Sequence, residues 1–210
     1  MRKELTYDRN IVAQEYYWDC GPATAQIMLS IRGRYVDENT LIREIGTTVN
    51  GTDFVGLVEN VLDVRLPDAG YTSVYLPNDP ISAAQKKTLW DNIVHSIDNG
   101  YGVVCNVDAP AGNHPIGVMG SETPNYGWDE ILHYLGVTGY SDEHPGGAVL
   151  FGDPGFLPNV YWVSFDQLAT LIPPKGYAYA AADAGFLNLL SPADQNIVRQ
   201  GFAQLGPAKW

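Results

Sequence analysis

The sequence predicts an α+β domain in which a helical half precedes an antiparallel sheet. Two observations support this prediction. Apolar residues recur at helical spacing in the first hundred residues, whereas short apolar runs between Gly, Pro and Asp turns dominate from residue 101 onward. Helices and strands that are segregated along the chain are typical of α+β folds. We expect one domain over residues 1–180 and a helical tail or linker over residues 181–210.

The clearest predicted helix covers residues 21–33. Pro22 suits the first turn of a helix, and Gly33 suits the position after the last turn. Between them apolar residues recur at helical spacing and charged residues are almost absent. We therefore expect this helix to be buried at the centre of the domain. Residues 5–18, which precede it, are polar and aromatic and are expected to be extended.

Further helices and strands follow in order along the chain. The helices are expected at residues 37–46, 53–62, 82–99 and 164–168. The strands are expected at residues 101–107, 130–140, 147–152 and 161–164. Near the end of the chain, residues 191–202 have the pattern of a capped helix with Ser191 as the N-cap.

A long polar loop at residues 108–129 separates the first two predicted strands. Loops of this length in a compact domain tend to be functional. The loop is therefore expected either to line a substrate cleft or to be a mobile surface excursion.

Composition argues against several classes of function. The chain is 45% hydrophobic, enough for a sizeable core, and its formal net charge is −12. Binding to nucleic acid or to an anionic membrane surface needs clustered Lys and Arg, so neither is expected. No apolar run is long enough to span a bilayer, and the first residues lack the apolar stretch of a signal peptide. We expect a soluble monomer in the cytoplasm of the cell that makes it.

The two cysteines lie in very different surroundings, so a disulfide is not expected and a reducing compartment is favoured. Cys105 belongs to an apolar run that reads as a buried strand, whereas Cys20 directly precedes Gly21 and the buried helix. Free N–H groups and the helix dipole at that position favour a thiolate. Cys20 is therefore the candidate nucleophile, and Gly21 has no side chain to crowd a substrate. The alternative is a small buried cysteine without a catalytic role.

Gln14 precedes Cys20 by a short segment. Its side-chain amide could fold back and donate to an oxyanion beside the N–H of Cys20. The alternative is an isolated polar residue without a role.

The chain has 4 histidines that are candidates for a catalytic base. His95 lies on the expected polar face of the helix at 82–99, His144 lies in a hairpin turn, and His114 lies in the long loop, where it is a candidate substrate contact. His133 alone falls within a predicted strand, where neighbouring residues can hold its ring.

Asp153 follows the strand that pairs with the strand of His133. The turn between these two strands makes them a hairpin, which brings Asp153 next to His133. Asp153 is then the candidate group that orients the base. An Asp in a Gly-Asp-Pro-Gly sequence is otherwise an ordinary turn former.

Together these motifs resemble the bacteriocin-processing-like branch of the papain-like cysteine peptidases. The resemblance rests on Gln14, Trp-Asp-Cys-Gly-Pro-Ala at 18–23, His-Tyr-Leu-Gly-Val-Thr-Gly-Tyr at 133–140 and Phe-Gly-Asp-Pro-Gly at 151–155. It spans roughly residues 10–180. It implies a papain-like fold, with a cysteine at the start of a buried central helix and His and Asp on an antiparallel sheet.

The resemblance also implies the roles of the site residues. The Cys20 thiolate would attack an amide carbonyl, and His133 would pass a proton to the leaving amine. Asp153 would orient the ring of His133, Gln14 and the Cys20 N–H would hold the oxyanion, and water would release the acyl-enzyme. No cofactor is implied. No metal site is expected either, because the His and Cys residues lack metal-ligand spacing.

Residues 14–33 and 45–53 resemble more closely the N-terminal peptidase domain of mycobacteriophage endolysins of the lysin A type. This resemblance implies peptidoglycan stem or cross-bridge peptides as substrates. It also implies an enzyme that waits in the host cytoplasm and reaches the wall through holin-made lesions. The residues expected to bind substrate are Trp18, Asp19, His114 and Trp128.

One departure from the endolysin pattern is the length of the chain. Such lysins usually carry a second catalytic domain and a wall-binding domain, for which 210 residues leave no room. The chain is then an excised domain, a short lysin or a relative with another role. Its acidic composition also lacks an evident basic surface for wall binding.

Three other functions remain open from the sequence. The first is a peptidase that processes a protein or a leader peptide ending in Gly-Gly. The second is a catalytically inactive binding module of the same fold. The third is a transferase that passes the acyl group to an amine instead of water.

Overall fold

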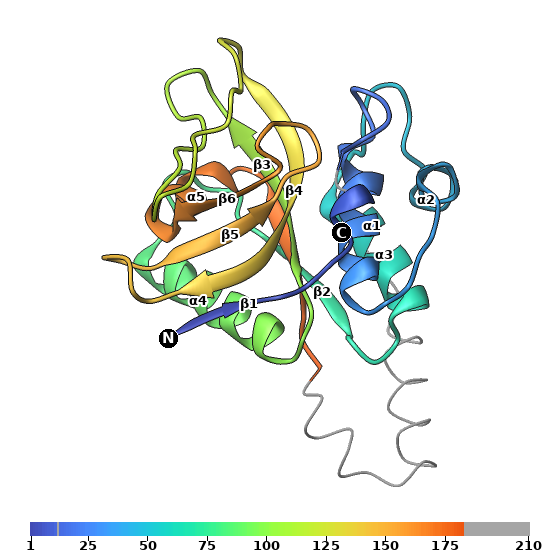
Figure 1. Ribbon diagram of the computed structural model, residues 1–210, viewed down its shortest axis with the longest axis horizontal. Helices are drawn as coiled ribbons and strands as arrows, with labels where there is room; N and C mark the ends of the chain where they lie inside the picture. The colour runs from blue at the N-terminus through green and yellow to red at the C-terminus, as the bar shows by residue number, and fades with distance from the viewer. Residues whose placement is uncertain (12, 183–210) are drawn as a thin grey trace, which may run out of the picture.

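The computed structural model describes residues 1–11 and 13–182. Within these residues an antiparallel seven-stranded sheet has helices α1–α3 packed on one face and helices α4 and α5 on the other (Figure 1). The predicted α+β fold is confirmed, with helices leading into an antiparallel sheet. The capped helix predicted at residues 191–202 lies outside the described residues.

Every helix predicted within the described residues is present. The helices are α1 (Cys20–Ile31), α2 (Glu38–Ile45), α3 (Val55–Arg65), α4 (Ala83–Asp98) and α5 (Phe165–Leu171), with a short 3-10 helix η1 at Arg9–Ile11. Their ends follow the sequence signals. Ser82 caps α4 by accepting from the N–H of Gln85, while Gly46 ends α2 in a left-handed conformation with φ of 77°.

The strands of the sheet are β1 (Arg2–Glu4), β2 (Tyr71–Tyr75), β3 (Val103–Ala109), β4 (Ile131–Ser141), β5 (Ala148–Gly152), β6 (Val160–Ser164) and β7 (Gly176–Ala180). Their order is β2-β7-β3-β4-β5-β6, and β1 pairs with β4. Neighbouring strands are antiparallel. The four strands predicted from the sequence are β3 to β6.

The sequence did not indicate three of these strands. β1 consists of three charged residues and has no apolar alternation, so only its pairing with residues 139–141 defines it. β2 and β7 pair with each other across a long separation in sequence. The prediction that residues 5–18 are extended is wrong, because this segment contains η1 and a series of turns.

The sheet separates two apolar cores, as the alternation along β3 makes clear. Cys105 and Val107 belong to the core that α4 and α5 cover, whereas Val104 belongs to the core beneath α1–α3. α4 buries Leu89 and Ile93 in the first core, along the inner face that the sequence predicted.

The central helix α1 lies very close to β4. A Cβ added at Gly136 of β4 would lie 2.5 Å from Cε of Met28, so the absence of a side chain at Gly136 permits this packing. The close approach brings the start of α1 to the sheet that carries His133. Among the residues described, no helix has the length and apolar character needed to cross a bilayer.

Candidate active site

Cys20 is the first residue of α1 and is buried. Asp19, the N-cap residue, makes no side-chain hydrogen bond to the first turn. The first N–H groups of a helix have no acceptor within the helix, so they and the helix dipole favour negative charge at this position. The backbone N–H of Cys20 is therefore available to an oxyanion.

Gly21 has a different role from the one expected. A Cβ at this position would collide with Oγ1 of Thr52, which is hydrogen-bonded to Oγ1 of Thr47 at 2.7 Å. The missing side chain of Gly21 therefore makes room for Thr52, in the segment that follows α2. It does not provide the clearance for substrate that was expected.

His133 lies near the start of β4 and bonds to both neighbours expected for a catalytic base. Its Nε2 lies 2.8 Å from Oδ1 of Asp153, and it also shares a side-chain hydrogen bond with Cys20. Because Nε2 is taken by Asp153, Nδ1 is the ring nitrogen left for the sulfur. The structure thus brings Cys20, His133 and Asp153 together.

Burial lowers the pKa of His133, but the charge and hydrogen bond of Asp153, with a smaller effect of Cys20, outweigh it and raise this pKa to about 10. The ring is therefore an imidazolium at neutral pH. An imidazolium beside a cysteine favours the thiolate form that attacks a carbonyl.

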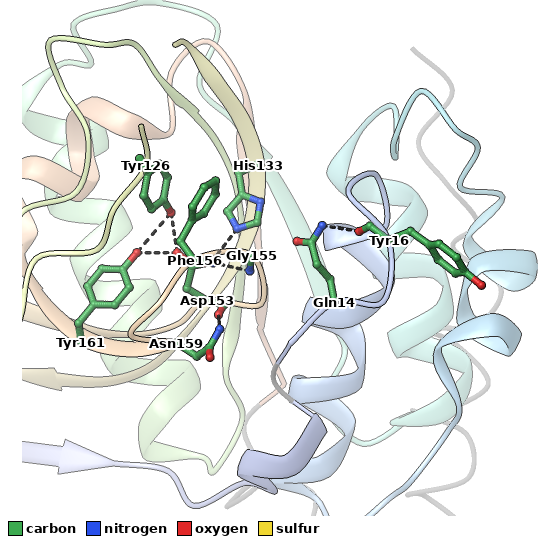
Figure 2. A network of polar contacts seen from close by, with 9 residues as sticks. All are labelled: Gln14, Tyr16, Tyr126, His133, Asp153, Gly155, Phe156, Asn159 and Tyr161. Atoms are coloured by element: carbon green, nitrogen blue, oxygen red, sulfur yellow. Dashed lines mark hydrogen bonds and ion pairs between the residues drawn. The ribbon is translucent and has the colours of Figure 1, made fainter. Parts of the chain in front are cut away.

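Asp153 is fully buried and receives hydrogen bonds from several sides (Figure 2). The hydroxyl groups of Tyr126 and Tyr161 both donate to Oδ2 at 2.6 Å, and the N–H of Gly155 donates to Oδ1 at 2.9 Å. Burial alone would raise the pKa of Asp153, but the charge and hydrogen bond of His133 and the hydrogen bonds of the two tyrosines lower it below its ordinary value. The carboxylate therefore stays ionised and fixed in position.

Aromatic rings hold the imidazole from the side. Phe156 meets His133 edge to face with ring centroids 5.3 Å apart, and Tyr126 stacks on Phe156 at 3.9 Å. These contacts leave the imidazole little freedom to turn away from Asp153.

The turn after β5 joins the sheet to the segment that carries Gln14. The N–H of Gln14 donates to the carbonyl of Pro154 at 2.9 Å. A Cβ added at Gly155 would lie 2.7 Å from Cε1 of His133 and 2.9 Å from Oε1 of Gln14, so only glycine fits between these side chains.

The side chain of Gln14 presents its oxygen to the site. Oε1 is directed toward His133 and has no hydrogen-bond partner among the described residues, while Nε2 donates to the carbonyl of Tyr16 at 2.5 Å (Figure 2). Donation to an oxyanion requires a half-turn of the amide about its last bond, so this role stays a prediction.

The four residues expected to bind substrate occupy different settings. Trp18 stacks on Tyr16 with ring centroids 5.1 Å apart, and Trp128 is 93% exposed. His114 packs against Tyr126 at 5.6 Å, which links it to the surroundings of Asp153. Asp19 is fully buried, so its carboxyl group is directed into the protein in this structure.

The remaining histidines and cysteine lie away from this arrangement. His95 of α4 contacts Asn99, and His144 lies in the turn between β4 and β5. Cys105 is fully buried, and burial raises the pKa of its thiol. Within residues 1–11 and 13–182, no cluster of three or more His, Cys, Asp or Glu residues is placed to hold a metal ion.

Sequence reasoning missed the two tyrosines that bind Asp153. Tyr126 lies in the long loop, which the sequence marked as a candidate functional segment, and Tyr161 lies on β6. Neither position carries a local signal, because the two hydroxyl groups meet Asp153 only when the loop and β6 pack together in the fold.

Comparison with known proteins identifies the group to which this site belongs. Residues 7–170 match the profile of the Peptidase_C39 like family. The chain belongs to this family. As a Peptidase_C39 like protein it is a cysteine-type peptidase, and Cys20, His133 and Asp153 are placed as a Cys-His-Asp triad.

Solved structures of peptidases are similar to this Peptidase_C39 like chain. One is a double glycine motif protease from an AMS/PCAT transporter in complex with the leader peptide, with a TM-score of 0.50 and 9% identity over 85% of this chain and 95% of that chain. Another is the peptidase domain of Streptococcus ComA, a bifunctional ABC transporter of a quorum-sensing pathway. Its TM-score is 0.47, with 19% identity over 81% of this chain and 96% of that chain. No curated protein matches the sequence significantly.

Proposed function

We propose that the protein is a cysteine endopeptidase that cleaves a polypeptide after a pair of small residues, of the Gly-Gly type that ends a leader peptide. Membership in the Peptidase_C39 like family supports the chemistry. The AMS/PCAT protease, whose structure holds a leader peptide, supports this class of substrate.

The observation that carries the proposal is the confinement of the catalytic groups. Cys20 is 8% exposed, His133 is 4% exposed and Asp153 is not exposed. The space beside His133 is so narrow that Gly155 could not carry a Cβ. Confinement of this kind favours a carbonyl flanked by small residues, such as Gly-Gly, over one flanked by bulky side chains.

The chemistry follows from the positions of the three groups. The Cys20 thiolate attacks the carbonyl carbon and forms a C–S bond, and the imidazolium of His133 gives its Nδ1 proton to the leaving nitrogen as the C–N bond breaks. Water then attacks the thioester carbon while neutral His133 accepts its proton, and the C–S bond breaks to release the acid product and restore the Cys20 thiolate. Asp153 keeps the ring in place, and the Cys20 N–H with the rotated Gln14 amide holds the oxyanion.

A second candidate is cleavage of peptidoglycan stem or cross-bridge peptides by an endolysin domain. The sequences of residues 14–33 and 45–53 favour it. The enzyme would then act from the host cytoplasm through holin-made lesions. The net charge of −12 gives no support to independent binding to the wall.

The two candidates are separated by offering both substrates to the same protein. The purified chain is incubated with a synthetic leader peptide containing Gly-Gly before a cargo segment, and separately with mycobacterial peptidoglycan, and the products are analysed by mass spectrometry. Cleavage after Gly-Gly by the parent and not by Cys20→Ala supports the proposal. A matched peptide with Val-Val in place of Gly-Gly should resist cleavage.

Two results would contradict the leader-type proposal. New peptide ends from peptidoglycan alone would replace it with the second candidate. Equal cleavage of the Gly-Gly and Val-Val peptides would refute the role given to the narrow site.

A further inference from the structure

Two buried carboxyl groups face each other beneath the segment that carries Gln14. Asp19 precedes α1 and is fully buried, and Glu38 is the first residue of α2 and is 3% exposed. Their side chains are joined by a hydrogen bond. Two carboxyl groups can share a hydrogen bond only when one of them is protonated, because a carboxylate has no proton to donate.

The pair also binds the backbone between Gln14 and Cys20. Both carboxyl oxygens of Asp19 accept from the N–H of Tyr16, at 3.1 and 3.0 Å. Oε1 of Glu38 accepts from the N–H of Glu15 at 3.4 Å. Two consecutive N–H groups of this segment are thus held by the carboxyl pair.

The engagement of Asp19 has a consequence for Cys20. A side-chain oxygen at an N-cap usually accepts from the first turn of its helix, but that of Asp19 is directed to Tyr16 and makes no such bond. The side chain of Asp19 therefore does not occupy the N–H groups at the start of α1. The same arrangement fixes the backbone of Tyr16, whose carbonyl accepts from Nε2 of Gln14 before the amide turns toward an oxyanion.

We propose that Glu38 is a positioning residue whose protonated carboxyl group holds the segment from Gln14 to Cys20 in the shape that the oxyanion site requires. This inference rests on the oxyanion role proposed above for Gln14 and the Cys20 N–H. Glu38 acts through Asp19 and Glu15 and does not itself touch the substrate.

The charges around Glu38 keep it protonated at neutral pH. Burial, followed by the hydrogen bond and charge of Asp19, raises the pKa of Glu38 to about 8, and Glu15 adds a further negative charge. The cations of the neighbouring helices are engaged elsewhere. Arg43 of α2 donates to Oγ1 of Thr40, and Arg65 of α3 pairs with Glu44.

The direction of the pH effect follows from these contacts. Below about pH 8 Glu38 carries the shared proton and the segment is held. Above this pH two carboxylates face each other without a proton, and their repulsion loosens the segment. The alkaline loss of activity should therefore begin before the imidazolium of His133 titrates.

The test compares Glu38→Gln with Glu38→Ala. A glutamine can donate from Nε2 to Asp19 and accept at Oε1 from Glu15 at every pH, so it mimics the protonated acid. We expect Glu38→Gln to keep kcat near neutral pH and to lose the alkaline decline. We expect Glu38→Ala to lower kcat roughly 10-fold or more at neutral pH with a smaller change in KM, since it weakens an oxyanion site. The substrate is whichever of the two above the parent cleaves.

A second measurement does not depend on the substrate. Amide hydrogen exchange at Glu15 and Tyr16 should speed up in Glu38→Ala and stay at the parental rate in Glu38→Gln. Alkylation of Cys20 by iodoacetamide, which needs no oxyanion site, should be nearly equal in all three proteins. If the parent cleaves neither substrate, the proposed substrate class fails while exchange still tests the role of Glu38.

Two outcomes would overturn the positioning role. One is an alkaline decline in Glu38→Gln that matches that of the parent. The other is exchange at Glu15 and Tyr16 that is the same in the parent and in Glu38→Ala.

Discussion

The backbone N–H of Gln14 donates a hydrogen bond of 2.9 Å to the carbonyl of Pro154, and this bond joins the segment before α1 to the sheet at the active site. The residues on either side of Pro154 also contact the active site. Asp153 holds His133, and Gly155 fits between His133 and Gln14. Three consecutive residues thus orient the base, anchor the segment with the proposed oxyanion donor, and set the width between them.

Gly155→Ala should impair catalysis far more than folding. The added methyl group would lie 2.7 Å from Cε1 of His133 and 2.9 Å from Oε1 of Gln14, so one of these side chains must move. We expect kcat/KM to fall roughly 100-fold, because misplacement of a catalytic group by about 1 Å has an effect of this order. The matched control is Gly112→Ala, where an added Cβ meets no atom within 4 Å. Equal activity of the two variants would show that the site is wider than the structure indicates.

Removing the tyrosine hydroxyl groups should weaken the hold on Asp153. Tyr126→Phe and Tyr161→Phe each delete a hydrogen bond of 2.6 Å to its buried carboxylate. A hydrogen bond to a charged group contributes roughly 1.5–3 kcal/mol, so each variant should lose stability of this order, and kcat should fall several-fold. Denaturant unfolding and peptide cleavage measure the two effects.

The control for these variants is Tyr177→Phe. Tyr177 is also fully buried, but its hydroxyl accepts from Nδ2 of Asn92 in the core beneath α4. Its loss should lower stability without changing kcat. A drop in kcat as large as that of Tyr126→Phe would contradict the assignment of the tyrosines to Asp153.

Substitution of the two cysteines should have opposite effects, with Cys20→Ala lowering activity and Cys105→Ala lowering stability. Cys20→Ala should abolish cleavage with little change in the free energy of unfolding, because Cys20 lies at the edge of the apolar core. Cys105→Ala should keep activity and lose roughly 1 kcal/mol, as expected for a small deletion in a fully buried position. Alkylation of the native protein by iodoacetamide should modify Cys20 and leave Cys105 free, since burial raises the pKa of the Cys105 thiol. An inactive but stable Cys105→Ala would reverse the choice of nucleophile.

Local signals in the sequence were enough for the helices and for the pairing of His133 with Asp153. Pro22 and Gly33 mark the ends of the central helix, and the hairpin between β4 and β5 follows from the turn that joins two apolar runs. These features depend on neighbours in the sequence, so pattern and propensity capture them.

Contacts between distant segments could not be predicted in this way. Glu38 lies in the first turn of a predicted helix, and nothing near it in the sequence indicates that it binds Asp19. The strand β1 consists of charged residues and is defined by its partner β4. Gly21 was expected to leave room for substrate, but the space is filled by Thr52, which lies on another segment. Tertiary packing decided each of these cases.

Asp153→Asn should narrow the pH range in which the catalytic pair is charged. The carboxylate of Asp153 raises the pKa of His133 to about 10 against the effect of burial, so the neutral amide should let this pKa fall. The imidazolium, which gives its proton to the leaving nitrogen, would then be lost at lower pH. In the Glu38→Gln background, kcat/KM for peptide cleavage, measured from about pH 5 to about pH 11, should therefore decline at lower pH in the variant than in its parent.

Asp153→Asn should also make the free energy of unfolding depend less on pH. Because the pKa of His133 is raised on folding, the charged pair contributes its full stability below the unfolded-state pKa of about 6.5 and loses it as the pH rises through about 10. Both proteins are measured in the Glu38→Gln background, so that the titration proposed for Glu38 does not contribute. The free energy of unfolding should fall between about pH 7 and about pH 10 when Asp153 is present and change less in the Asp153→Asn variant. Identical slopes would mean that His133 is not held as an imidazolium by Asp153.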